Sequence, residues 1–286
     1  MNGVPARVAL SRAFRAPVAR LALTLLLALG VAALAAPLLT VRDPAAQPDI
    51  VGGRYLPPSA IHPFGTDAYS RDVYSRVLYG ARISLGVAVG AVALAMTLGT
   101  LVGAVAGLVG GWTDTLLMRV VDALLAVPRL LLVLALVATV GTLTPGGIVL
   151  VLGGTGWPGM SRIVRSEVRS IGARDFVVAA RATGVPEWRV LMRHILPGVL
   201  PQVLVAGTLA LATVIPLEAG LSFLGLGVQP PHASWGNIIL EGSDRPMETW
   251  WLLLFPGLAI VATVLSANTL GERLRDAVDP RQLPPR

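Results

Sequence analysis

Few side chains in this sequence are placed to perform chemistry. The chain has three histidines, His62, His194 and His232, no cysteine and no lysine. No His-x-x-x-His spacing or carboxylate pair indicates a metal site or a general acid and base. The lack of cysteine excludes disulfides, and the lack of lysine excludes a phosphate-binding loop, which needs one. We therefore expect no catalytic residue, metal ion or cofactor, and we expect any nucleotide hydrolysis to come from another chain.

One acidic residue, Glu218, lies inside an apolar segment and is the sharpest chemical signal in the sequence. An acid within a membrane helix is a candidate for a transport path or its gate. The alternatives are a structural hydrogen bond, or a position near the outer end of the helix where the carboxylate reaches water. Some nearby polar residues could line a hydrated path with it, although such residues also serve as packing residues in membrane helices: Thr208, Thr213, Ser222 and Asn268.

The composition indicates a membrane protein. Of 286 residues, 54% are hydrophobic and 14% are charged, whereas about a quarter are charged in ordinary soluble domains. Mean hydropathy is +0.72. The net charge of +7 comes from arginines scattered beside apolar segments. This pattern is typical of membrane topology, so we expect a lipid bilayer and no nucleic acid as partner.

The apolar segments predict an all-α polytopic membrane protein with about six transmembrane helices. We expect a cytoplasmic segment at 1–20, a first span at 21–41 and an external, proline-rich loop at 42–82. The alternative for the first span is a signal peptide cleaved near Ala33-Leu34-Ala35. The core, 83–271, is expected to hold five further spans, and 272–286 to be a cytoplasmic tail. The core spans are placed between Arg82 and Asp114 and at 121–142, 145–163, 200–222 and 249–271.

The distribution of arginine predicts the orientation. Arginines are concentrated in 1–20, in 162–193 and after 271, and are sparser in the other segments between spans. The positive-inside rule then puts both termini and the segment 174–197 in the cytoplasm. Arg119 and Asp122 stand three residues apart and are expected to pair near the inner surface.

Four glycines in the second span repeat at every fourth position, a spacing that lets another helix approach backbone to backbone. They could form an interface with another subunit or pack against a helix of the same chain. The four are Gly99, Gly103, Gly107 and Gly111.

The segment 174–197 is too charged to lie in lipid and is expected to be a soluble loop between spans. Gly184 is suited to the left-handed conformation that closes a helix, and Pro186 to the first turn of the next. Glu187 favours the positive end of that second helix, and Pro197 is expected to stop it. A helix-glycine-helix elbow with small residues on one face has a shape that suits docking to another protein.

These residues resemble a known family. The pattern V-A-A-x-x-x-G-x9-H-x-L-P, from Val178 to Pro197, resembles the EAA loop of ABC-importer permeases. Val178 stands where that pattern has Glu, and His194 where it has Ile. The flanking segments are similar to dipeptide, oligopeptide and nickel permeases of the DppC/OppC type: HPFGTD at 62–67, SRDVYSRVLYGARISL at 70–85, GGWTDTLLMRVVDALLAVP at 110–128, LSFLGLGVQPP at 221–231 and SWGNIILEG at 234–242.

The resemblance implies a type I (MetI-like) permease fold in a bacterial inner membrane. It implies a homologous second permease, two cytoplasmic ATPases and an external substrate-binding protein as partners, with peptides as cargo and nickel or another small solute as the alternative. A secondary transporter with Glu218 as coupling acid is the rival from a different class, but we find no internal repeat to support it. The ATPase-coupling residues implied by the resemblance are Ala179, Ala180, Ala182, Gly184, Glu187, His194, Leu196 and Pro197.

Overall fold

The computed structural model describes residues 16–141 and 143–278, and the ordered elements in these ranges are helices. Most of the predicted N-terminal segment, 1–15, and the last residues of the predicted tail, 279–286, lie outside the described ranges. The helices are α2 (Pro17–Leu34), α3 (Ala36–Leu39), α4 (Val73–Val109), α5 (Gly111–Ala126), α6 (Arg129–Val140), α7 (Pro145–Gly172), α8 (Asp175–Ala182), α9 (Glu187–Val190), a π-helical turn (Leu191–Ile195), α10 (Leu196–Phe223), α11 (Trp235–Gly242) and α12 (Trp250–Val278).

Four helical stretches in the described residues are long and apolar enough to cross a membrane: Pro17–Leu34, Val73–Val109, Glu187–Phe223 and Trp250–Val278. The pair α5 and α6 makes a fifth candidate if the two are taken together, although they bend by 86° where they meet. The expected third span corresponds to this bent pair, which has the form of a broken span or of a re-entrant loop. The expected fourth span, α7, is a continuous helix that is not among these candidates. Several glycines and Pro158 dilute its apolar first half, and Arg162, Arg165 and Arg169 follow in its second half.

The second span begins earlier than expected, at Val73, inside the predicted external loop. Asp72 caps this helix, because its side chain accepts a hydrogen bond from the Ser75 backbone N–H at 2.9 Å. The cap fixes the point where the proline-rich segment ends.

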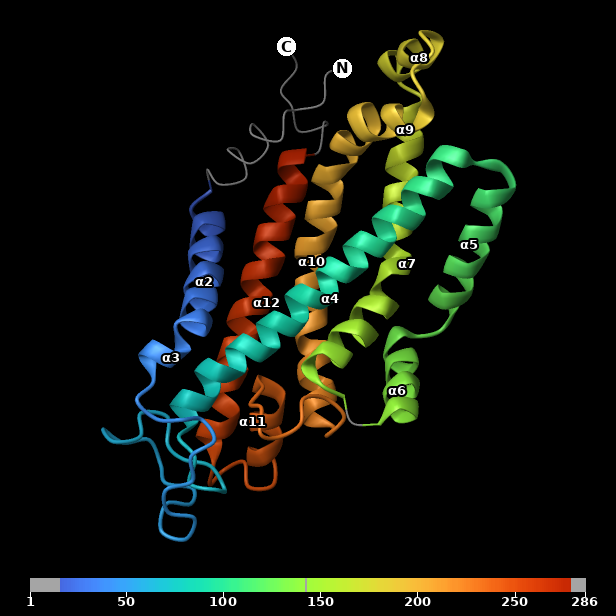
Figure 1. Cartoon of the computed structure of the whole chain (residues 1–286). Helices are drawn as coiled ribbons and strands as arrows, with labels where there is room; N and C mark the ends of the chain where they lie inside the picture. Colours follow the sequence, from blue (N-terminus) through green and yellow to red (C-terminus); the bar gives the residue numbers. More distant parts are fainter. Residues whose placement is uncertain (1–15, 142, 279–286) are drawn as a thin grey trace.

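The helices form a bundle with two distinct ends (Figure 1). One end, which we call the elbow end, carries α8 and α9 together with the start of α2 and the end of α12. The other, the loop end, carries α11 and the segment 40–72.

The glycine repeat packs α4 on α7 of the same chain. A Cβ built on Gly99 would lie 2.5 Å from the Cβ of Met160, and one on Gly103 would lie 2.5 Å from the Ser161 carbonyl oxygen. A Cβ on Gly107 would meet Val168 at 2.8 Å. Since no side chain fits in these gaps, the two backbones approach closely over several turns.

Gly111 does not belong to this packing, contrary to the expectation from its spacing. Helix α4 ends at Val109, and Gly111 opens α5 with a positive φ of 55°. A Cβ built on it would meet nothing within 4 Å. The chain turns there, so the fourth glycine serves the turn and not the contact with α7.

Candidate functional site

The elbow, residues 175–190, has the helix-glycine-helix form expected from the sequence. Gly184 has a φ of 80°. Its N–H donates to the Arg181 carbonyl at 2.9 Å, and the Val185 N–H donates to the Ala180 carbonyl at 3.3 Å. This pair of bonds is the Schellman arrangement, in which a left-handed glycine closes a helix. Gly184 therefore sets the angle between α8 and α9.

The elbow is fastened to the bundle by apolar and ionic contacts. Val177 and Val190 are fully buried in a cluster with residues of α7 and α10. The Arg181 guanidinium contacts both Glu187 carboxylate oxygens, at 2.9 and 3.2 Å, and also donates to the Gly172 carbonyl at 3.0 Å. One side chain thus joins the end of α7 to both helices of the elbow.

The outward face of the elbow exposes large apolar side chains. Phe176, Val178 and Trp188 are 49%, 52% and 63% exposed, and Met192 follows at 57%. Ala179, Ala182, Gly184 and Glu187 are also exposed, and Ala180 is half-buried. Exposed aromatic and aliphatic side chains beside small residues are a feature of surfaces that bind another protein.

The chain does not break at Pro197, contrary to the expectation from sequence. Helix α9 continues through the π-helical turn Leu191–Ile195 into α10, where Pro197 lies in the first turn. Proline is tolerated in the first turn of a helix, and the π turn before α10 changes the hydrogen-bond pattern just ahead of Pro197. His194 lies in this turn, half-buried, and Leu196 begins α10. The elbow is therefore continuous with the long helix α10.

Glu218 is fully buried in α10, so it does not reach water as one interpretation proposed. Ser222, one turn later, donates to its Oε1 at 2.8 Å. The other polar residues considered for a path do not gather around it. The hydroxyls of Thr208 and Thr213 donate to carbonyls of their own helix at 2.8 Å. Asn268 lies exposed on α12.

Sequence reasoning missed a buried ionic cluster at the loop end. Asp67 is fully buried and accepts from Arg71 Nε at 2.7 Å and also from Arg76. Both arginines reach Glu241 of α11, Arg71 at 2.9 and 3.0 Å. The cluster ties the segment before α4 to α11, far away in sequence. Its members lie inside the motifs quoted above at 62–67, 70–85 and 234–242. The charged residues shared by these three motifs are the sequence signal that could have predicted the cluster.

A second set of ion pairs joins α5 to α7. Asp114, 6% exposed, accepts from Arg165 Nη2 at 2.6 Å and also contacts Arg169. Asp122 pairs with Arg162 of α7 and not with Arg119, so the expected pair within α5 is wrong. The acids of α5 face the arginines of α7. Pairing between the two helices therefore replaces the pairing of residues three apart within α5.

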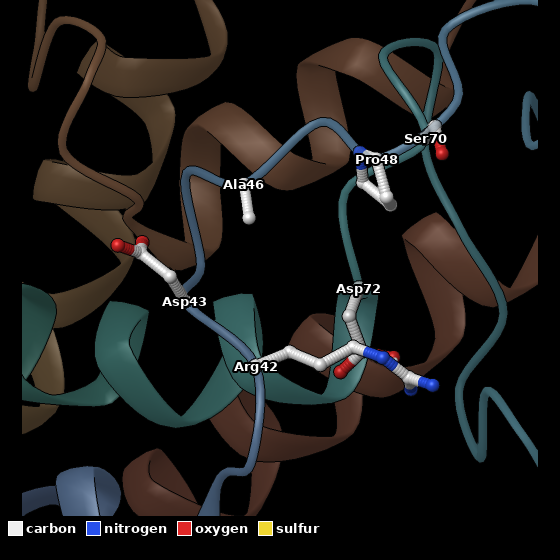
Figure 2. A pocket seen from close by; sticks show the side chains of 6 residues that line it. All are labelled: Arg42, Asp43, Ala46, Pro48, Ser70 and Asp72. Atoms are coloured by element: carbon white, nitrogen blue, oxygen red, sulfur yellow. The ribbon is translucent and has the colours of Figure 1, made fainter.

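The loop end has a small cavity of about 170 Å³, lined by Arg42, Asp43, Ala46, Pro48, Ser70 and Asp72 (Figure 2). Its charged groups already have partners. Arg42 donates to the Ile61 carbonyl at 2.5 Å, and Asp72 accepts from Ser75 and contacts His62 at 3.0 Å. Among the described residues, no cluster of three or more His, Cys, Asp or Glu side chains could hold a metal ion.

Comparison with known proteins identifies the family. The model of the family described as "Binding-protein-dependent transport system inner membrane component" matches residues 99–283. A Brucella suis protein named "Putative peptide transport system permease protein" is 42% identical over 265 residues, covering 92% of this chain and 87% of the relative. The dipeptide transport system permease protein DppC of Bacillus subtilis is 40% identical over 227 residues, covering 79% and 71%. DppC of Alkalihalophilus pseudofirmus is 39% identical over 224 residues, covering 78% and 73%.

Membership implies an ATPase and a binding protein as partners, and it makes this chain the permease rather than the catalytic component. The chain belongs to the multi-pass inner membrane permeases of binding-protein-dependent, ATP-binding-cassette transport systems.

Proposed function

We propose that this permease forms half of a translocation pathway for peptides, and that a homologous second permease forms the other half. Relatives named as peptide and dipeptide permeases, at 42% and 40% identity, favour peptides over nickel or another small solute. Two separate cytoplasmic ATPases drive the cycle, and an external binding protein delivers the cargo.

The observation that carries this proposal is the construction of the elbow. Its outward face exposes large apolar side chains, while its inward face is fastened to α7. The chain of the elbow continues without a break into α10. A movement of an ATPase bound to the outward face would therefore act on two long helices at once. Helix α7 in turn packs along α4 through the glycines. The elbow thus has the connections that a coupling element needs.

The proposed topology has six spans in the type I (MetI-like) arrangement. Helix α7 runs the length of the bundle beside α4, and α5 with α6 cover the same distance in two pieces (Figure 1). A polar helix is tolerated within a membrane where neighbouring helices shield it and its arginines are paired. With six spans, the elbow end and both termini lie in the cytoplasm of a bacterial cell and the loop end lies outside.

Exposed apolar residues on α5 and α6 form a surface that a permease partner could share with lipid. Trp112, Leu130, Leu131 and Val140 are between 49% and 79% exposed. A face of this kind needs to be covered by lipid or by another transmembrane subunit.

Glu218 does not support a secondary transporter. Its carboxyl is fully buried and engaged by Ser222, and the family assigns energy supply to an ATPase. Energy coupling and cargo are tested together by reconstituting the complex with its binding protein in liposomes. Labelled dipeptide should enter with ATP and not with a proton gradient alone, and unlabelled dipeptide should compete where Ni²⁺ does not. Uptake that follows the gradient without ATP, or that Ni²⁺ abolishes, would contradict the proposal.

A further inference from the structure

Glu218 lies where three elements meet. It belongs to α10, and serine hydroxyls approach its carboxyl from α10, from α4 and from the N-cap of α11. Ser222 of α10 donates a hydrogen bond to Oε1 at 2.8 Å, whereas Oε2 has no hydrogen bond with a described residue. Ser84 and Ser234 lie close to the same carboxyl group. All four side chains are buried.

The same three hydroxyls hold the segment that follows α10. Each hydroxyl oxygen accepts a hydrogen bond from a backbone N–H of this segment, so each keeps its own proton to donate. The Glu218 carboxyl is the acceptor that they share. The pairs are the Val228 N–H on Ser222 at 3.1 Å, the Trp235 N–H on Ser84 at 3.2 Å and the Asn237 N–H on Ser234 at 3.3 Å.

Close packing surrounds this network. A Cβ built on Gly236 would lie 2.3 Å from the Ala219 carbonyl oxygen, and one on Gly227 would lie 2.1 Å from Ser222 Oγ. The Trp235 indole donates to the Val77 carbonyl at 3.1 Å. The first turn of α11 is therefore seated directly on α10 and α4, and its positive end faces the Glu218 carboxyl.

We propose that Glu218 is a positioning residue, the acceptor that fixes the N-terminus of α11 on α10 and α4 and so sets the surface on which the binding protein lands. It does this through Ser84, Ser222 and Ser234 and does not contact the transported solute. The inference rests on the proposed function, because it requires the loop end to be external.

The test is hydrogen exchange of the complete transporter in nanodiscs, read by mass spectrometry over residues 226–240. Glu218→Gln keeps the shape but replaces one acceptor by an N–H donor, which opposes the serine protons. Since a buried hydrogen-bonding group that is left unpaired bears its full desolvation penalty, exchange should rise about tenfold or more. For Glu218→Asp, which keeps the carboxyl group, exchange should rise less. Glu248→Gln, at an exposed acid of the same loop, should match the wild type.

A second readout separates positioning from a general loss of structure. At equal membrane levels, Glu218→Gln should raise the half-saturating concentration of binding protein several-fold, and Glu218→Asp should restore part of it. If Glu218→Gln does not insert, Ser84→Ala removes one arm and should speed exchange around Trp235 alone. Unchanged exchange over 226–240 in the inserted variants, or a change in solute selectivity without a change in exchange, would overturn the inference. Failure of ATP-driven peptide uptake in the wild type would instead count against the proposed function, whatever the exchange shows.

Discussion

Replacing Gly184 by Val perturbs the elbow in a way that the structure makes calculable. Gly184 has a φ of 80°, and a Cβ built on it would meet nothing within 4 Å. The cost is therefore backbone strain and not a clash within the chain. A left-handed residue other than Gly costs roughly 1–2 kcal/mol, which corresponds to about 5- to 30-fold in an equilibrium. Because Gly184 is exposed and contributes no side chain to the packing of the bundle, we expect the loss to fall on ATPase docking.

The assay is co-purification of the ATPases with the permease at matched membrane levels, together with ATP-driven uptake. Gly184→Val should recover about 5- to 30-fold less ATPase under sub-saturating conditions. Gly184→Asn is the matched control, because Asn is bulky but tolerates the left-handed region. Asn should therefore retain most of the binding. Recovery and uptake for Gly184→Val equal to those of the wild type would refute the reasoning. Equal losses for Val and Asn would show that bulk at the docking surface, and not strain, is responsible.

Two predictions concern stability of the purified protein. Asp67→Asn deprives Arg71 and Arg76 of a buried partner and should lower the free energy of unfolding by about 3–5 kcal/mol. The control Asp122→Asn, at a pair whose side chains are 53% exposed, should lower it by under about 1 kcal/mol. Thermal unfolding in detergent distinguishes the two variants, and equal unfolding midpoints would contradict the stabilising role of the ionic cluster. Gly103→Ala places a methyl against the backbone of α7 and should cost about 1–3 kcal/mol, and an unchanged unfolding midpoint would show that the two helices separate easily.

The orientation is tested by thiol labelling in this naturally cysteine-free chain. A single cysteine at Ala46 should react with an impermeant reagent in intact spheroplasts, and one at Glu187 should react only after lysis. Labelling of Glu187→Cys in sealed spheroplasts would reverse the proposed topology.

The elbow could be predicted because its determinants are local. Gly184 and Pro186 mark the turn within a few residues, and the hydrogen bonds that close it involve neighbours in sequence. Features set by distant residues could not be predicted in this way. Arg76 meets Glu241 only after the chain has crossed the bundle repeatedly, and Asp122 meets Arg162 of α7.

Two local signals were overridden by their surroundings. Pro197 predicts the end of a helix, yet the π turn before it continues directly into α10. Gly111 continues the four-residue spacing of the glycines, yet α4 ends before it. In both places the backbone geometry of neighbouring residues determines where the helix ends. The pattern of residue types in the sequence does not contain that geometry.

Cross-linking from the outward face of the elbow tests the central claim most directly. A photoreactive maleimide on Val178→Cys, 52% exposed on α8, should attach to an ATPase subunit on illumination of the assembled complex. The same probe on Ala46→Cys at the loop end should not. ATPase cross-linked from Val178→Cys alone is the result that coupling through the elbow predicts. No ATPase adduct from that position, in a complex that still imports peptide, would contradict it.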